Sequence, residues 1–200
     1  MKKDLFAHKS KSWDMKSLRV KNAKSIASVI VENIDLKDDM HLADLGAGTG
    51  LLSFFLSQKV SKITALDNSK SMLEVFESKK DEFLCDIEIV EMDISCQKLD
   101  KKFDGIVSSM TIHHVKDTKK LLQNLHDMLE DGGFIALADL ESEDGSFHSD
   151  NEGVFHFGFD TEELLKIAKE VGFKDLKVFE SGKIDKPHME FIVFCLVGFK

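Results

Sequence analysis

A glycine-rich turn is the part of the sequence with the clearest capacity for chemistry. It reads Asp44-Leu-Gly-Ala-Gly-Thr-Gly50 and follows a short apolar run. Glycine has no Cβ, so the backbone can turn sharply there and approach a ligand closely. In open parallel sheets, ligands bind at the carboxyl ends of the strands, usually over the first turn of this kind. By itself, the turn is compatible with a nucleotide-binding loop or with a tight turn that binds nothing.

Two acidic residues occupy equivalent positions further along the chain. Asp67 ends the second apolar run, about twenty residues after the first glycine, where a carboxylate can accept both hydroxyls of a ribose. It could equally cap a helix that starts near Ser69. Asp93 ends the third run, where it could bind an adenine amino group while Ile94 packs on the ring, or only cap a turn. Three such motifs at successive strand ends favour a nucleoside site more than any one does.

Five motifs in this order resemble those of class I S-adenosylmethionine-dependent methyltransferases. They are Ala43-Asp-Leu-Gly-Ala-Gly-Thr-Gly50, Ala65-Leu-Asp-Asn68, Met92-Asp-Ile94, Phe103-Asp-Gly-Ile-Val-Ser-Ser109 and Asp131-Gly-Gly133. The resemblance implies that Gly46 and Gly48 line the methionine part of the cofactor S-adenosyl-L-methionine. It implies further that Asp67 binds the ribose and that Asp93 and Ile94 bind adenine. On this basis we predict a cofactor site that consists of Trp13, Asp44, Gly46, Ala47, Gly48, Asp67, Asn68, Asp93, Ile94 and Ser109.

The charge of the turn favours this cofactor over a nicotinamide dinucleotide. S-adenosylmethionine carries a sulfonium and an ammonium group and no pyrophosphate, so Asp44 would attract it but would repel phosphates. The turn also has the pattern Gly-x-Gly-x-Gly and lacks the third glycine position of the dinucleotide fingerprint. A nicotinamide-dependent oxidoreductase is therefore disfavoured.

Four histidines are predicted as catalytic residues. Methyl transfer is an in-line displacement at an activated carbon, so positioning of the acceptor can supply most of the acceleration. A hydroxyl or ammonium acceptor also needs a general base, and histidine is the side chain best suited to that role. His113 and His114 follow the fourth apolar run, and His148 and His156 lie in the segment after the fifth. The alternative for His113 and His114 is that they only satisfy backbone groups.

The segment 141–159 is predicted to be a substrate-binding insertion. It combines Phe147, Phe155, Phe157 and Phe159 with glycines and two of the histidines. Apolar walls with a few polar groups are typical of small-molecule pockets, and long loops of this kind often act as lids. The alternative is a loop whose phenylalanines complete the core. The N-terminal segment 1–38 is likewise predicted to be a helical lid, in which Trp13 closes over the cofactor or serves as a packing anchor.

Nucleic-acid substrates are disfavoured by both motifs and charge. Amino-methylating DNA enzymes have a proline pair followed by an aromatic residue after the fourth strand, whereas this chain reads Ser108-Ser-Met-Thr111. Cytosine C5 methyltransferases attack with a cysteine that follows a proline, but Leu84, Ser95 and Phe194 precede the cysteines here. The net charge of −9 at pH 7 would also repel phosphate backbones. We therefore expect no DNA partner.

Two further acceptor classes lack their characteristic residues. The glutamate pair of protein arginine methyltransferases has no counterpart after Ser109. Asp139 has no obvious carboxylate partner, which disfavours a metal-assisted catechol-type site, and we predict no metal ligands. A small-molecule acceptor is therefore the leading prediction. The alternatives are a protein or structured-RNA methyltransferase, or a non-catalytic module that binds S-adenosylmethionine.

The elements that position these residues are predicted from the apolar pattern. Amphipathic or capped segments predict helices at 16–34, 50–58, 69–83, 118–130 and 160–171, with a possible capping box formed by Ser71 and Glu74. Short apolar runs predict strands at 41–45, 63–66, 87–92, 103–108, 134–140, 176–181 and 189–197. Alternation of strands with helices predicts a mainly parallel sheet with helices on both faces. The last two strands are joined by a connection too short for a parallel crossover, so one strand must be antiparallel.

Length and composition predict a single Rossmann-like α/β domain over residues 1–200. The chain has 42% hydrophobic residues, enough for one core. Its N-terminus has no signal-peptide pattern, and the longest apolar stretch, 191–199, is too short to span a bilayer. We therefore expect a cytoplasmic protein without a membrane partner, whose three cysteines are reduced, packed thiols. The basic segment 1–24 is interpreted as a solvated surface. The oligomeric state cannot be deduced from the sequence.

Overall fold

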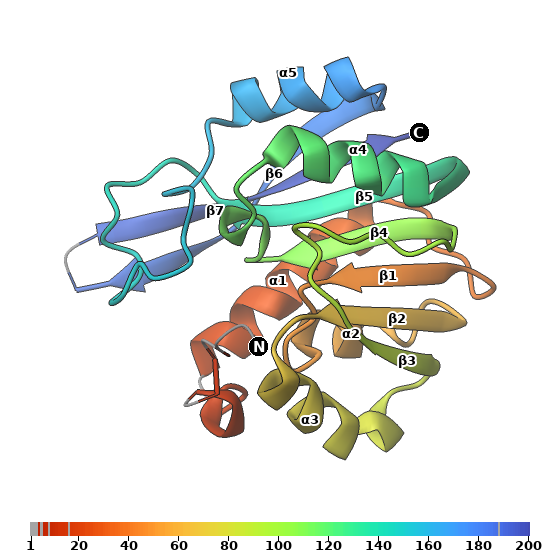
Figure 1. The fold of residues 1–200 in the computed structure, drawn as a ribbon, viewed down its shortest axis with the longest axis horizontal. Helices are drawn as coiled ribbons and strands as arrows, with labels where there is room; N and C mark the ends of the chain where they lie inside the picture. Colours follow the sequence, from red (N-terminus) through yellow and green to blue (C-terminus); the bar gives the residue numbers. More distant parts are fainter. Residues whose placement is uncertain (1–3, 5, 8, 16, 188) are drawn as a thin grey trace.

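The computed structural model describes the chain except for residues 1–3, 5, 8, 16 and 188. Strands and helices alternate along most of it (Figure 1). The strands are β1 His41–Leu45, β2 Lys62–Asp67, β3 Asp86–Glu91, β4 Phe103–Ser109, β5 Leu129–Leu140, β6 Lys174–Lys186 and β7 Met189–Phe199. The α-helices are α1 Ser17–Asn33, α2 Leu51–Leu56, α3 Lys70–Ser78, α4 Thr118–Met128 and α5 Thr161–Val171. Short 3-10 turns are η1 Ser10–Ser12, η2 Lys80–Glu82 and η3 Ile112–His114.

The seven strands form one sheet in the order β3-β2-β1-β4-β5-β7-β6. Strands β1 to β5 are parallel, and β7 is antiparallel to both of its neighbours, β5 and β6. The chain builds outward from β1 to β3 and then returns to place β4 on the other side of β1. This topological switch opens a crevice at the carboxyl ends of β1 and β4. The predicted single α/β domain, with its mostly parallel sheet and one antiparallel strand, is confirmed.

Helices cover both faces of the sheet, as predicted. Ile26 and Ile30 of α1 and Leu56 of α2 pack into one apolar cluster, together with inward-facing residues of β1 and β5. Leu125 of α4 and Leu164 of α5 pack into a second cluster on the opposite face. Figure 1 shows α4 and α5 together on one side, with α1 behind the sheet. Burial on both faces explains why the central strands read as continuous apolar runs.

Several predicted boundaries differ from the observed ones. Helix α3 is capped by Ser69, whose Oγ accepts from the Met72 N–H at 3.3 Å, so the predicted capping box at Ser71 is wrong. Strand β6 runs on to Lys186 rather than ending at residue 181, because cross-strand bonds to β7 continue past Gly182. Gly182 has a φ of 151° and marks a register shift that interrupts the alternating pattern. Residue 16, the predicted start of the first helix, lies outside the described residues.

The prediction of a strand in the apolar C-terminal stretch is confirmed, whereas the prediction of packed thiols is not correct for all three cysteines. All three cysteines are free thiols. Cys195 is buried in β7 and Cys85 is half-buried, but Cys96 is exposed, so the prediction of packed thiols is wrong for that residue. The stretch 191–199 is part of β7, as predicted. In the described part of the chain, no helix is both long and apolar enough to cross a membrane.

Candidate functional site

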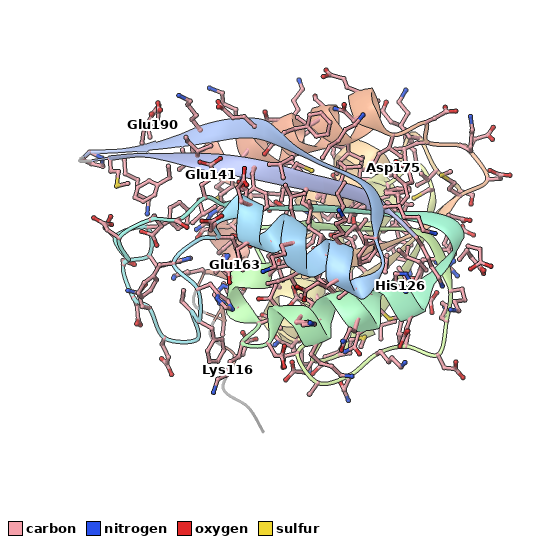
Figure 2. The ribbon with its side chains drawn as sticks, turned by 90° about the horizontal axis from the view of Figure 1, so that it is seen from above. Lys116, His126, Glu141, Glu163, Asp175 and Glu190 are labelled. Atoms are coloured by element: carbon pink, nitrogen blue, oxygen red, sulfur yellow. The ribbon has the colours of Figure 1, made fainter. Side chains whose placement is uncertain are left out.

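A cavity of about 1470 Å³ lies at the carboxyl ends of the parallel strands. It is larger than the roughly 300–1,000 Å³ of common ligand pockets, so a cofactor and an acceptor could both fit. Figure 1 shows the N-terminal segment, the loop after β5 and the β6–β7 hairpin gathered on this side of the sheet. From above, Lys116 and Glu190 lie toward this side, and His126 and Asp175 lie toward the opposite one (Figure 2). All the residues predicted for the site, cofactor-binding and catalytic, line this cavity.

The glycine-rich turn connects β1 to α2 and forms the floor of the cavity. Gly46 and Gly48 have positive φ values of 69° and 55°. A Cβ on Gly46 would lie 2.2 Å from side-chain atoms of Thr111, so no larger residue fits there without a rearrangement. A Cβ on Gly48 would meet no atom within 4 Å. The two glycines therefore have different roles: Gly46 permits close packing, while Gly48 keeps backbone exposed to the cavity.

Asp44 is a buried carboxylate beside this turn with one oxygen unpaired. Its Oδ2 accepts from Ser53 Oγ at 2.6 Å, whereas Oδ1 is buried and has no hydrogen-bond partner among the described residues. Burial, reinforced by the charge of Asp67, raises the pKa of Asp44 to about 7. Burial of a carboxylate oxygen that has no hydrogen-bond partner destabilises the folded state. A cationic ligand in the cavity would supply one.

Asp67 links the ends of β1 and β2. Its Oδ2 accepts from the Gly48 N–H at 2.8 Å, and its Oδ1 accepts from the Ser69 N–H at 2.7 Å. Burial raises the pKa of this carboxylate, although these backbone donors oppose the shift. Asn68 follows it along the cavity wall. The carboxylate thus holds the glycine turn against the start of α3, and each oxygen keeps capacity for a further donor.

Asp93 and Ile94 line the cavity at the end of β3. The Asp93 Oδ1 accepts from the Ser95 N–H at 3.0 Å and from Ser95 Oγ at 2.5 Å. Asp93 therefore caps this turn, which is one of the two roles that the sequence allows for it. Ile94 is buried. Across the crevice, Ser109 and Ala47 complete the predicted cofactor set on the cavity wall.

The described part of the N-terminal segment lies against the cofactor end of the cavity. Asp14 accepts from Thr49 Oγ1 at 2.5 Å and forms an ion pair with Lys79. Asp4 accepts from the Ser71 N–H at 3.1 Å, at the first turn of α3. Trp13 lines the cavity and stacks under the Arg19 guanidinium, 3.4 Å from its ring centroid. Trp13 is therefore at once a wall of the cavity and a packing anchor, and a lid role for residues 1–38 stays a prediction.

His113 forms a buried pair with Asp139 at the end of β5. The His113 Nδ1 lies 2.7 Å from Asp139 Oδ1, and its backbone N–H donates to Oδ2 at 3.2 Å. Both side chains are almost fully buried. The His113 Nε2 is buried, and no group in the described part of the chain hydrogen-bonds to it. The carboxylate holds the Nδ1–H tautomer, which leaves Nε2 as a proton acceptor.

Asp139 is thus a candidate residue that the sequence analysis missed. The sequence indicates Asp139 only as a metal ligand that lacks a carboxylate partner, whereas its partner in the structure is a histidine. The available signal was an aspartate in an otherwise apolar strand, Phe134 to Leu140, next to the carboxyl end. In the described residues, no three His, Cys, Asp or Glu side chains are placed to hold a metal ion.

The other three predicted histidines differ in their surroundings. The His148 ring lies 5.0 Å from that of His113, and its Nε2 is buried without a partner. Burial lowers the pKa of His148 to about 4, with His113 and His114 adding to the effect. His114 Nδ1 lies 2.8 Å from the Gly153 carbonyl oxygen, and burial lowers its pKa. His156 Nε2 contacts the Val115 oxygen at 3.0 Å, which favours a structural role for that ring.

The loop 141–159 divides its phenylalanines between core and cavity. Phe159 is only 8% exposed and packs in the second apolar cluster, while Phe157 is 45% exposed. Phe147 lines the cavity, 5.1 Å from the Phe191 ring centroid, and Phe155 lines it as well. The N–H groups of Phe155 and His156 bond to the His113 carbonyl oxygen. Phe159 therefore completes the core, as in the alternative interpretation, whereas a substrate-binding role of this loop stays a prediction.

Comparison with known proteins agrees with this architecture. Residues 43–137 match a family described as a methyltransferase domain. An uncharacterized methyltransferase of Schizosaccharomyces pombe is 27% identical over 74% of this chain and 58% of its own length. Malonyl-[acyl-carrier protein] O-methyltransferase of Acetivibrio thermocellus is 25% identical over 96% of this chain and 72% of its own length.

A solved structure shares the fold at lower sequence identity. Phosphoethanolamine N-methyltransferase 2 of Haemonchus contortus, in complex with S-adenosyl-L-methionine, superimposes with a TM-score of 0.71 at 17% identity, over 88% of this chain and 52% of that one. The chain therefore spans little more than half the length of some of its relatives. With the matched residues 43–137 and the sheet order, the chain is similar to the class I, Rossmann-like S-adenosylmethionine-dependent methyltransferases.

Proposed function

We propose that this protein transfers the methyl group of S-adenosyl-L-methionine to a small-molecule acceptor. The observation that carries the proposal is the convergence of the glycine turn, the strand-end carboxylates and a buried His–Asp pair on one cavity. The first two would bind the cofactor. The His–Asp pair would remove a proton from the acceptor in the adjoining part of the same cavity.

The residues at the carboxyl ends of β1 to β3 fit the proposed cofactor chemically. Its ammonium group would satisfy the unpaired Asp44 Oδ1, and the exposed backbone at Gly48 allows close approach. Asp67 would receive the ribose hydroxyls, and Asp93 with Ile94 would receive adenine. When bound, the cofactor supplies a methyl carbon that is already activated by the sulfonium group, so no protein nucleophile is required.

His113 is the best placed of the predicted catalytic histidines to remove a proton from the acceptor. Asp139 fixes its Nδ1–H, so the unpaired Nε2 can accept a proton from a hydroxyl or ammonium group as the new bond forms. Asp139 would also stabilise the resulting imidazolium. His148 and His114 would form the neighbouring wall and stay uncharged, and His156 would hold the loop in place.

A small molecule suits the concave, partly aromatic acceptor end better than a macromolecule. Phe147 and Phe155 supply apolar walls, and the histidines supply a few convergent polar groups. The net charge of −9 also opposes unaided binding of nucleic acid. A non-catalytic module would have no use for a base next to its cofactor, so the His113–Asp139 pair favours an enzyme. A cytoplasmic location is part of the proposal.

Calorimetry and a turnover screen test the proposal in two steps. S-adenosylmethionine and S-adenosylhomocysteine are first titrated into the purified protein, and both should bind with one site per chain. A panel of metabolites with hydroxyl, amine and carboxyl groups is then screened for release of S-adenosylhomocysteine. Failure of either ligand to bind would refute the cofactor site. Binding without turnover of any metabolite would favour the non-catalytic or macromolecular alternatives.

A further inference from the structure

Among the described residues, a lysine at the acceptor end of the cavity has no carboxylate partner. Lys186 ends β6 and lines the cavity together with Phe147, His148 and Ile184. Its Nζ lies 4.0 Å from the centroid of the Phe147 ring and 5.5 Å from that of Phe191. In the described part of the chain, no carboxylate lies within 4.0 Å of this ammonium group, unlike the ammonium groups of the paired lysines.

Lys183, on the same strand, provides a comparison because it is paired with a carboxylate on the protein surface. It forms an exposed ion pair with Glu190 of β7 at 2.7 Å and does not line the cavity. Such cross-strand pairs between solvent-exposed residues are common and contribute little energy. Lys186 departs from this pattern, because its charge sits over aromatic rings at the cavity wall. The hairpin therefore directs one cation inward and pairs the other on its surface.

The groups that surround Lys186 leave its charge largely uncompensated. Glu143 is the acid that acts on it electrostatically, but the Glu143 Oε2 accepts from the backbone N–H groups of Gly145 and Phe147 at 2.7 and 3.2 Å. His148, which also feels the charge of Lys186, is uncharged at neutral pH because its pKa is about 4. Partial burial also lowers the pKa of Lys186 itself. A desolvated ammonium beside apolar rings gains most from a charged hydrogen-bond acceptor.

We propose that Lys186 binds an anionic group of the methyl acceptor, either a carboxylate or a phosphate. Phe147, which lines the cavity, would pack against the apolar body that carries the anion. The site would thereby orient the acceptor, with its anionic end on the β6–β7 hairpin and its reacting atom toward His113. This inference rests on the proposed function and specifies its substrate class: anionic rather than neutral or cationic acceptors.

Binding of simple probes tests this site without knowledge of the natural acceptor. Benzoate and phenyl phosphate are titrated into the protein saturated with S-adenosylhomocysteine, and benzamide serves as the neutral probe of the same shape. We compare the wild type with Lys186→Met, which keeps the apolar stem, and with Lys183→Met as the matched surface control. NMR or calorimetry gives the dissociation constants, and the stronger of the two anions identifies the preferred group.

Only the substitution at Lys186 is expected to remove the preference for anions. At least one anion should bind the wild type and Lys183→Met about tenfold more tightly than benzamide, and Lys186→Met should remove that difference. Equal anion binding by Lys186→Met and the wild type, or no preference for either anion over benzamide, would overturn the proposal. Cofactor affinity should be the same in all three proteins, so loss of the anion preference alone leaves the proposed function standing. Absence of cofactor binding in the wild type would instead refute the proposed function.

Discussion

Asp44 shows how a single buried carboxylate can reduce the stability of the free protein while preparing a ligand site. Its Oδ1 is unpaired and its pKa is raised to about 7 by burial. A raised pKa means that the folded state binds the proton more tightly than the unfolded chain does. The contribution of this group to stability is therefore full below the unfolded value of about 4 and is lost as the pH rises through about 7.

Asp44→Asn should separate stability from cofactor binding. The amide does not ionise, so at about pH 8 the free variant should be more stable than the wild type by roughly 1–3 kcal/mol, with little difference near pH 4. Its affinity for S-adenosylmethionine should fall, and the rise in wild-type affinity between about pH 6 and pH 8 should disappear. Thermal unfolding and calorimetry across this range measure both. A variant that binds the cofactor as tightly as the wild type would argue against an ammonium partner for Asp44.

Asp139→Asn tests whether the carboxylate positions His113 for proton transfer. The asparagine keeps the size of the side chain but can present an amide N–H to Nδ1, which favours the wrong tautomer. With an identified acceptor, kcat should fall at least about a hundredfold while KM and cofactor affinity change little. His113→Gln should cause a similar loss, and the two changes together should cost no more than either alone. Additive losses would indicate that the two residues act independently.

At the scale of elements, the loop 141–159 is held by contacts at both of its ends. Phe159 anchors one end in the core, and its N–H bonds to the Leu140 oxygen. The Glu143 carboxylate organises the other end through the N–H groups of Gly145 and Phe147. Between them, the loop is bonded to the His113 carbonyl oxygen. The cavity wall formed by this loop is therefore connected to the His113–Asp139 pair through the backbone.

Replacement of two phenylalanines in this loop should destabilise the protein to different extents. Phe159→Ala removes a side chain that is 8% exposed and should destabilise the protein by roughly 2–4 kcal/mol. Phe157→Ala removes one that is 45% exposed and should cost less than about 0.5–1 kcal/mol. Chemical denaturation with urea measures both. Similar losses in the two variants would mean that Phe157 is covered in solution.

At the scale of the whole molecule, the cofactor should stabilise the folded state by contacting separate parts of the chain. The cavity joins the N-terminal segment, the carboxyl ends of the four parallel strands β1 to β4 and the loop after β5. A ligand that binds only the folded state stabilises it by about 2.7 kcal/mol at one hundred times its dissociation constant. For a chain of this size, that corresponds to a rise in Tm of roughly 5–10 °C.

Asp67→Ala should abolish this stabilisation. The carboxylate accepts from Gly48 and Ser69, so its removal both takes away the proposed ribose ligand and loosens the glycine turn. The free variant should lose roughly 1–3 kcal/mol of stability but should remain folded. Addition of S-adenosylmethionine should then raise Tm in the wild type only. An undiminished shift, together with unchanged affinity by calorimetry, would remove Asp67 from the cofactor site.

The sequence by itself determined the α/β class, the reversed strand and the residues that meet at the cavity. Strand runs, helix periodicity and the Asp44–Gly50 turn are local patterns, and the topology of parallel sheets brings successive strand ends together. The pairing of His113 with Asp139, the unpaired Oδ1 of Asp44 and the inward position of Lys186 depended on the tertiary structure. Each arises from side chains that are distant in sequence and whose partners are set by packing, which no local pattern encodes.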